Sequence, residues 1–378
     1  MHSIQMVDLK RQYTRIKAEV DAGIREVIDN TAFINGKAVT DFAGNLSKYL
    51  GSKYVIPCAN GTDALQIAMM SLNFQPGDEI IAPSFTYIAT TEVIALLRLK
   101  TVFVDVDAQT FCIDPQAIEK AITPKTKAIV PVHLYGQAAN MEAIMDIARR
   151  HNLYVIEDNA QAIGSDYTFS NGTVKKTGTI GTIGATSFFP SKNLGCYGDG
   201  GAIFTDDETL ASRLKMIANH GQSTRYYHDM VGCNSRLDSI QAAVLNVKLK
   251  HLDAYIAARI SAAEVYDSAF ANQSKIKTPY RAPYSNHVFH QYTLILEGVD
   301  RDGLNKFLAE KNIPSMIYYP VPAHRQKMFK SLGGNEYKLE VTDWLTTRVI
   351  SLPMHTELTT EQLTYITDNV LEYINETP

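Results

Sequence analysis

Apolar residues in the first two thirds of the chain recur with two different periods. They follow helical spacing between residues 62 and 72 and again over residues 141–150. Short apolar runs that are typical of strands lie at residues 79–82, 101–106, 128–132 and 154–156. Alternation of helix-like and strand-like segments indicates an α/β fold whose mainly parallel central sheet carries helices on both faces.

The pattern becomes less regular along the rest of the chain. Ser170-Asn171-Gly172 predicts a hairpin with a type I′ turn, because Asn-Gly tolerates positive φ angles. Two further strands follow at residues 185–189 and 201–205, and a long helix at residues 238–252. We therefore expect a large domain of residues 1–252 and a smaller α+β domain of residues 253–378, with which residues 1–20 can pack.

Composition and charge exclude several classes of protein. The chain has 378 residues, 45% of them hydrophobic, which is ordinary for a globular protein of two domains. A net charge of −4 gives no bulk attraction to nucleic acid or an anionic membrane. No apolar run reaches the roughly 18 residues of a membrane span. Without a signal peptide, a CxxC pair or metal-ligand spacing, we expect a cytoplasmic protein with free thiols and no metal.

Candidate chemistry lies where ligands bind in open α/β sheets, beyond the carboxyl ends of the strands. Asn60-Gly61-Thr62 is a glycine turn that feeds a helix, so its backbone N–H groups suit a phosphate. An ordinary helix cap explains the same residues. Glu157-Asp158-Asn159 directly follows a strand, and a carboxylate there can bind a protonated ring nitrogen or again cap a helix.

The third candidate is a lysine in a loop between two apolar strands. Lys192 lies in Ser187-Phe188-Phe189-Pro190-Ser191-Lys192-Asn193-Leu194-Gly195, with more glycines from Gly198 to Gly201. A buried lysine becomes neutral and can attack a carbonyl group. The alternative is a solvated surface lysine, which is the more common situation for a lysine chosen at random.

Taken together, these segments resemble the DegT/DnrJ/EryC1/StrS family of sugar aminotransferases, from Val7-Asp8-Leu9 to Ser351-Leu352-Pro353-Met354-His355. The resemblance implies fold type I of the pyridoxal 5′-phosphate (PLP) enzymes, with Lys192 forming the Schiff base to PLP. It implies that Asp158 keeps the ring nitrogen protonated, so that the ring serves as an electron sink. The other implied cofactor contacts are Gly61, Thr62 and Ser187 at the phosphate, Gln161 near the ring hydroxyl, Tyr87 stacked on the ring, and Asn234 reaching the phosphate from the neighbouring subunit of a homodimer.

The resemblance also implies substrate contacts. Arg236 can bind a carboxylate in bidentate fashion, whether of the amino donor or of a uronic acid sugar. The implied sugar contacts are Tyr318, Tyr319 and His324. Here the chain departs from the family pattern, because Tyr318 stands where histidine is usual and Ala323 where leucine is common.

The implied activity is transfer of an amino group from L-glutamate, leaving 2-oxoglutarate, to a nucleotide-linked keto-sugar. Lys192 anchors the cofactor and moves the proton, whereas related dehydratases have histidine at this position. The run from Phe188 to Gly201 looks most like the branch that aminates C3 of UDP-2-acetamido-2-deoxy-3-oxo-glucuronate for a surface polysaccharide such as lipopolysaccharide O-antigen. The alternatives are a C3 or C4 aminotransferase of a dTDP- or UDP-linked 6-deoxy keto-sugar, an aminotransferase for a carbocyclic or amino acid substrate, and a non-catalytic PLP-binding regulator.

Overall fold

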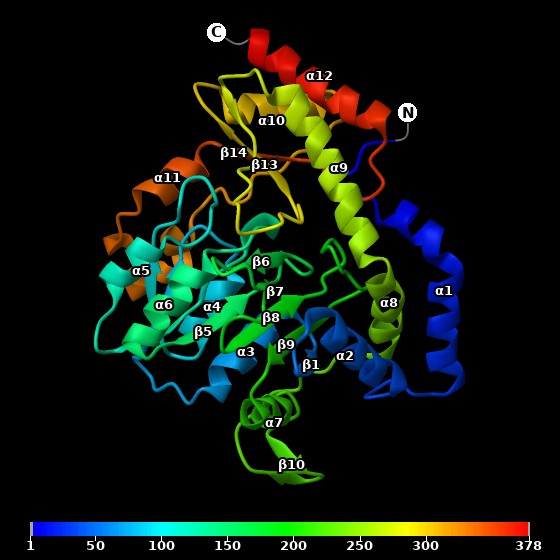
Figure 1. The fold of residues 1–378 in the computed structure, drawn as a ribbon, viewed down its shortest axis with the longest axis vertical. Coiled ribbons are helices and arrows are strands. Elements are labelled where there is room, and N and C mark those ends of the chain that lie inside the picture. The colour runs from blue at the N-terminus through cyan, green and yellow to red at the C-terminus, as the bar shows by residue number, and fades with distance from the viewer. Residues whose placement is uncertain (1–2, 377–378) are drawn as a thin grey trace.

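The central feature of the computed structural model, which describes residues 3–376, is a seven-stranded sheet (Figure 1). Its strands are β1 (Tyr54–Cys58), β2 (Glu79–Pro83), β3 (Lys100–Val104), β4 (Thr126–Ile129), β5 (Tyr154–Asp158), β8 (Ile183–Ser187) and β9 (Gly201–Thr205). Their order is β1-β9-β8-β5-β4-β2-β3. Only β9 runs against the others within this sheet. The predicted mainly parallel sheet is therefore confirmed.

Both faces of the sheet are buried. Ile80 and Ile81 are neighbours on β2, so their side chains point to opposite faces, and each belongs to a different apolar cluster. Burial on both sides explains why the strands read as continuous apolar runs. The surrounding helices are α2 (Lys37–Leu50), α3 (Gly61–Ser71), α4 (Ala89–Leu96), α5 (Pro115–Ala121), α6 (Met141–His151), α7 (Glu208–Ile217) and α8 (Ser239–Lys250).

The C-terminal part has a second sheet and its own apolar cluster. Strands β12 (Ile276–Lys277), β13 (Tyr292–Leu296) and β14 (Val349–Leu352) are antiparallel. Ile4, from the N-terminal segment, lies in the same apolar cluster. The helices of the C-terminal part are α9 (Leu252–Phe270), α10 (Arg301–Glu310), α11 (Glu340–Thr346) and α12 (Thr360–Glu376), with short 3₁₀ turns η2 (Ala323–Arg325), η3 (Lys327–Leu332) and η4 (Gly334–Glu336).

The long helix α1 (Leu9–Asp29) packs beside α8, and both ends of the described chain lie in the upper part of Figure 1. Helix α8 ends at Lys250 and α9 begins at Leu252, so the predicted domain boundary near residue 252 falls at this junction. The division into two domains stays a prediction. Within residues 3–376, no helix is long and apolar enough to cross a membrane.

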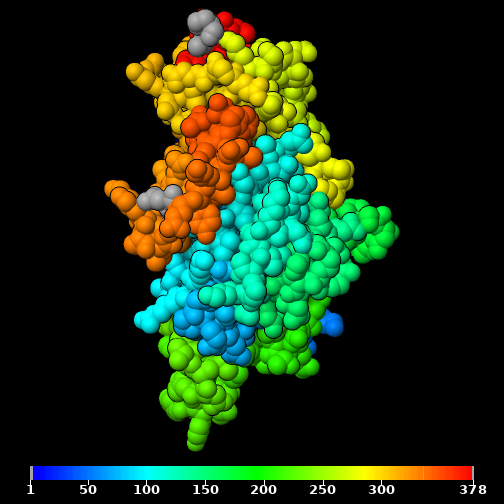
Figure 2. All heavy atoms as spheres, turned by 90° about the vertical axis from the view of Figure 1, so that its left-hand side faces the viewer, coloured from blue at the N-terminus to red at the C-terminus, as the bar shows by residue number. Residues whose placement is uncertain are grey.

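Two hairpins form small sheets of their own outside the main sheet. Strands β6 (Asp166–Thr168) and β7 (Val174–Lys176) form the predicted one, but its turn differs from type I′. Gly172 has a φ of 83°, whereas Asn171 has no positive φ, so the turn matches a type I turn that ends in a left-handed glycine. The other hairpin, β10 (Gln222–Thr224) and β11 (Tyr227–His228), projects below α7 as a knob (Figures 1 and 2).

Candidate active site

The carboxyl ends of the parallel strands bring the predicted segments to one edge of the sheet. Strand β1 ends at Cys58, just before the Gly61 turn, β5 ends at Asp158 and β8 ends at Ser187. The loop from β8 to β9 carries Lys192 along the same edge, because β9 runs back antiparallel from Gly201. Segments that are far apart in sequence thus meet at one place.

The loop that carries Lys192 is held from both sides. The backbone N–H of Phe188 donates to the carbonyl of Gly200 at 2.7 Å, and the N–H of Lys192 donates to Phe189 at 2.8 Å. Side chains of Phe188 and Leu194 are fully buried beneath it. Asn193 donates from Nδ2 to the carbonyl of Val288 at 2.9 Å, which ties the loop to the segment before β13. The position of the lysine is therefore fixed by packing and by hydrogen bonds.

The amine of Lys192 is suited to nucleophilic attack near neutral pH. Burial lowers the pKa of Lys192 to about 8, against the opposing effect of the Asp158 carboxylate. A lysine with this pKa is about one tenth neutral at pH 7, compared with roughly one part in 3,000 for an ordinary lysine. The neutral amine is the form that attacks a carbonyl carbon and accepts a proton.

Asp158 lies at the end of β5 with only 6% of its surface exposed. The Thr90 hydroxyl donates to its Oδ2 at 2.8 Å, and the backbone N–H of Ala160 donates to its Oδ1 at 3.1 Å. Burial raises the pKa of Asp158, while Thr90, Ala160 and then Lys192 act in the opposite direction. Since a carboxylate has about four acceptor sites, Asp158 retains capacity for a further donor such as a protonated ring nitrogen.

The N-terminus of α3 lies beside Ser187. The side chain of Asn60 caps the helix by accepting from Asp63 N–H at 2.8 Å, which leaves the N–H groups of Gly61 and Thr62 without an acceptor inside the helix. A Cβ atom on Gly61 would lie 2.7 Å from the Cβ of Ser187, so only glycine allows this approach. The result is a cradle of helix N–H groups and a hydroxyl, which suits a phosphate.

Two predicted residues, Tyr87 and Gln161, both lie next to Tyr319. The Oε1 of Gln161 accepts from the backbone N–H of Tyr135 at 2.7 Å, and its Nε2 donates to the Tyr319 hydroxyl at 3.0 Å. This pair of bonds fixes the orientation of the amide. Tyr87 is 57% exposed and its ring centroid lies 6.2 Å from that of Tyr319. By contrast, Phe85 is buried, so Tyr87 is the aromatic of that segment with an open face.

The chemistry and placement of these residues fit PLP. The amine of Lys192 has its pKa lowered by burial, Asp158 retains free acceptor capacity, and the Gly61 cradle excludes any side chain. Together they supply a partner for the aldehyde, the ring nitrogen and the phosphate of one cofactor. Their individual contacts with PLP stay predictions.

Two predicted residues, Asn234 and Arg236, lie on the segment that follows the β10–β11 hairpin. Asn234 is exposed on the segment after the β10–β11 hairpin. Arg236 lines a different groove of about 1,080 Å³ between α2, β1, α7 and that hairpin, together with Arg225. Between them, the Ser235 hydroxyl accepts from Ala59 N–H at 3.1 Å, just before the Gly61 turn. The roles of Asn234 and Arg236 stay predictions.

The side chain of His324 is buried. Only 1% of its surface is exposed, and its Nδ1 lies 2.6 Å from the hydroxyl of Ser84. The imidazole therefore packs beneath the loop after β2 and has no open side for a sugar. In the same segment, Tyr318 and Tyr319 are partly buried, and the Tyr318 carbonyl accepts from the Tyr135 hydroxyl. Tyr319 is hydrogen-bonded to Gln161 at 3.0 Å, and the substrate contacts of both tyrosines stay predictions.

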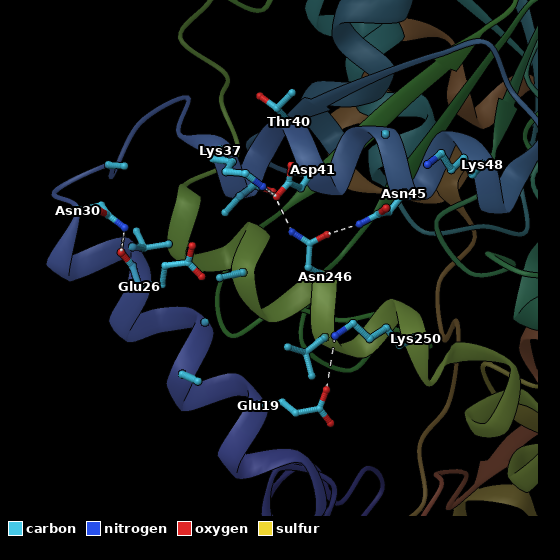
Figure 3. A pocket seen from close by; sticks show the side chains of 18 residues that line it. Glu19, Glu26, Asn30, Lys37, Thr40, Asp41, Asn45, Lys48, Asn246 and Lys250 are labelled. Carbon is cyan, nitrogen blue, oxygen red and sulfur yellow. Dashed lines mark hydrogen bonds and ion pairs between the residues drawn. The ribbon is translucent and has the colours of Figure 1, made fainter.

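A separate groove lies between α1, α2 and α8, away from this edge of the sheet (Figure 3). It measures about 1,020 Å³ and has mainly polar and small side chains on its walls. Lys37 pairs with Asp41, and Lys250 lies 3.6 Å from Glu19, so charges of both signs already have partners there. None of the predicted site residues lines this groove, so the size of a groove alone does not identify the active site.

Sequence reasoning missed several residues that hold the site in place. Thr90 did not figure in the sequence analysis, yet its hydroxyl donates to Asp158. Tyr135 orients Gln161 from a left-handed backbone conformation with a φ of 59°. His290 is buried, and burial followed by the charge of Lys192 lowers its pKa well below the ordinary value. A histidine near the lysine had no sequence signal, because the two are almost a hundred residues apart.

A loop lysine at the carboxyl edge of a parallel sheet, facing an aspartate and a glycine cradle, defines the class of fold type I PLP-dependent enzymes. The chain belongs to the DegT/DnrJ/EryC1/StrS aminotransferase family, whose model matches residues 14–371. It is therefore an aminotransferase with PLP as its cofactor. The family resemblance predicted from three short segments is confirmed over nearly the whole chain.

Several relatives are similar along almost their full length. The UDP-2-acetamido-2-deoxy-3-oxo-D-glucuronate aminotransferase of Pseudomonas aeruginosa is 46% identical, over 96% of this chain and 98% of that protein. A pleiotropic regulatory protein of Geobacillus stearothermophilus is 45% identical, over 98% of both chains. The UDP-N-acetyl-3-dehydro-alpha-D-glucosamine 3-aminotransferase of Acidithiobacillus ferrooxidans is 42% identical, over 96% of both. The predicted likeness to the first of these enzymes is confirmed.

Solved structures agree with the fold. DesV of S. venezuelae, in complex with a ketimine intermediate, superposes with a TM-score of 0.95 and covers 100% of both chains at 37% identity. The whole chain, including its C-terminal part, therefore has the architecture of this family.

Proposed function

We propose that the chain transfers the amino group of L-glutamate to C3 of UDP-2-acetamido-2-deoxy-3-oxo-glucuronate, in the cytoplasm, on a route to a surface polysaccharide such as lipopolysaccharide O-antigen. The observation that carries the proposal is the full-length similarity to two enzymes whose names specify a UDP-linked sugar with an oxidised C3. The intact Lys192 and Asp158 support catalysis. The glutamate donor is proposed from the resemblance.

The chain's own residues explain how the reaction can proceed. When bound, PLP supplies an aldehyde carbon for the amine and a ring that withdraws electrons. Lys192 first holds the cofactor and, once displaced by the donor amine, can take the proton from the donor's Cα because its pKa is near neutral. Asp158 keeps a negative charge beside the ring nitrogen. The exposed ring of Tyr87, with its centroid 6.2 Å from that of Tyr319, offers a surface on which the cofactor ring can stack.

The nucleotide-sugar assignment is tested by a comparison of amino-sugar products in the reverse half-reaction. We expect UDP-2-acetamido-3-amino-2,3-dideoxyglucuronate to convert the bound cofactor with a kcat/KM at least about tenfold above dTDP-linked 3- or 4-amino-6-deoxy sugars, a difference of about 1.4 kcal/mol. The change of the cofactor's visible absorption measures the rate. A preference for the dTDP sugars would replace the uronic acid by the 6-deoxy alternative. L-Glutamate serves as the matched donor control, since it must act whichever sugar is accepted.

We further propose that the active unit is a homodimer whose sites are shared. Large apolar side chains are exposed between α1 and α2 and from the turn of the β10–β11 hairpin onward, including Phe33, Ile34, Tyr226 and Val231. Exposed apolar side chains in such number are typical of a protein interface. Asn234 is also exposed, on the segment after the β10–β11 hairpin, where it can reach a neighbouring chain.

Mixing two inactive variants tests the shared site. Lys192→Ala removes the anchor from one chain, and Asn234→Ala removes the proposed phosphate contact from the other. A mixed dimer then has one intact site, so random reassociation should recover about a quarter of the wild-type activity. Recovery is measured after the two variants are unfolded and refolded together. Activity no higher than the sum of the separate variants would contradict a shared site, provided that Asn234→Ala alone is impaired.

A regulatory role is the second candidate, because one relative at 45% identity is named a pleiotropic regulatory protein. A binding module has no need of a lysine whose pKa is lowered to about 8 opposite a buried aspartate. Conversion of the cofactor by L-glutamate separates the two roles. We therefore propose the enzyme.

A further inference from the structure

A buried histidine–glutamate pair lies directly behind the cofactor site. The side chains of His133 and Glu157 are both fully buried, and the Nε2 of His133 lies 2.8 Å from the Oε2 of Glu157. Glu157 precedes Asp158 on β5, and His133 follows β4, the neighbouring parallel strand. Successive residues of a strand point to opposite faces, so Glu157 points away from the face on which Asp158 meets the cofactor.

Hydrogen bonds determine the proton positions in this pair. The Nδ1 of His133 accepts the backbone N–H of Ala139 at 3.1 Å. The proton of a neutral imidazole is therefore on Nε2, and Nε2 donates to Glu157. Glu157 in turn accepts four N–H donors and donates to none, which is the bonding of a carboxylate anion.

The other three donors to Glu157 come from the turn before β8. Gly178 N–H donates to Oε2 at 2.8 Å, while Ile180 and Gly181 donate to Oε1 at 2.6 and 2.5 Å. Gly178 has a φ of 85°, and a Cβ on Gly181 would lie 2.8 Å from the carbonyl of Val155. The glycines spaced by threes in Gly178-Thr179-Ile180-Gly181 thus serve to wrap the backbone around one carboxylate.

The pair is connected to both polar side chains that face the cofactor ring. The backbone N–H of His133 donates to the carbonyl of Asp158 at 3.1 Å, and Asp158 N–H donates to Pro131 at 2.9 Å. His133 also leads directly into η1 (Leu134–Gly136), where Tyr135 N–H holds Gln161. The same buried unit thus fixes Asp158 through the strand and Gln161 through the turn.

We propose that His133 and Glu157 are positioning residues of the transamination reaction. The pair holds Asp158 and Gln161 in register with the cofactor ring, and the Glu157 anion adds a fixed negative charge that favours the protonated form of the bound cofactor. The charge of Glu157 can act on the cofactor without touching it, because little water screens a buried charge. This role rests on the aminotransferase activity and is independent of which sugar accepts the amine.

The test uses the PLP-loaded protein without any sugar. Glu157→Gln keeps the shape of the side chain and removes its charge. We expect the pH midpoint of the cofactor's visible absorption to fall by about 0.5–1 unit, because the protonated form loses an attractive charge. We also expect PLP to dissociate about tenfold more readily, as when supporting residues of a bound group are lost. Glu79→Gln is the matched control. Glu79 is also buried, but it is the first residue of β2 and therefore lies at the edge of the sheet opposite the cofactor site.

A second pair of variants keeps the test decisive if Glu157→Gln does not fold. His133→Leu removes the side-chain donor to Glu157, whereas His133→Gln retains an N–H group that can reach it. We expect PLP affinity to fall about tenfold in the leucine variant and to recover in the glutamine variant. Unchanged affinity and an unchanged absorption midpoint in the folded Glu157→Gln or His133→Leu proteins would overturn the proposal. Because no sugar is present, a wrong sugar assignment leaves these results unaffected.

Discussion

Replacement of Lys192 by alanine should lower turnover with L-glutamate by at least about 10⁴-fold, because one residue supplies both the covalent anchor and the proton transfer. The amine of Lys192 is partly neutral near physiological pH since burial lowers its pKa to about 8. Among the residues placed at the site above, Lys192 is the one that carries an amine. Stopped-flow absorption of the glutamate half-reaction measures the loss.

Lys248 provides the matched control for this prediction. It is also a buried lysine whose pKa burial lowers to about 8, but its Nζ lies over the ring of Tyr197, 4.6 Å from the centroid. Lys248→Ala should therefore leave the covalent attachment of PLP intact and affect chiefly the stability of α8. If instead the Lys248 variant lost the cofactor's absorption band and the Lys192 variant kept it, the assignment of the anchor would be wrong.

The pH dependence follows from the same pKa. In the cofactor-free protein the neutral amine of Lys192 is the reactive form, so its rate of attachment to PLP should rise with pH and level off above about pH 8. An ordinary exposed lysine would continue to gain reactivity up to about pH 10.4. A small added amine such as methylamine should partly restore proton transfer to the alanine variant, because it supplies the missing base.

The main sheet was predictable because its strands are buried on both faces. Runs such as Glu79–Pro83 show as apolar segments between turn residues, and their alternation with helices indicates parallel pairing. The predicted type I′ turn at Asn171-Gly172 was wrong, because one left-handed glycine after a type I turn closes the same hairpin. Turn type depends on the residue count of the loop, which the Asn-Gly pair alone does not determine.

The cofactor site was predictable in part. Lys192, Asp158 and Gly61 each lie at the carboxyl end of a strand, so topology brings them together once the strands are recognised. Thr90 and His133 carried no such signal, because their roles depend on hydrogen bonds to residues far along the chain. The substrate contact predicted for His324 stays a prediction. Its motif suggested a sugar contact, whereas in this chain the imidazole is buried against the Ser84 hydroxyl.

Asp158→Asn should reduce kcat of the glutamate half-reaction by about 10²–10³-fold, or roughly 3–4 kcal/mol, through loss of a buried charge beside the ring nitrogen. The substitution keeps the side chain's shape. Its amide can donate to the Thr90 oxygen, and the Thr90 hydroxyl can then turn toward Thr86, whose Oγ1 lies 3.2 Å away. The fold should therefore survive, which circular dichroism and thermal unfolding can verify.

Thr90→Val separates charge from orientation at Asp158. It removes the hydroxyl that donates at 2.8 Å but leaves the carboxylate ionisable. We expect kcat to fall by about tenfold, less than in the asparagine variant. A single hydrogen bond to a charged group contributes about 1.5–3 kcal/mol, and the low end of that range corresponds to about tenfold. Burial already raises the pKa of Asp158, and loss of the Thr90 donor should raise it further, so the acidic limb of the kcat profile should move to higher pH. A kcat of Asp158→Asn within a few-fold of wild type would show that the ring nitrogen needs no charged partner, and the electron-sink role of this site would have to be abandoned.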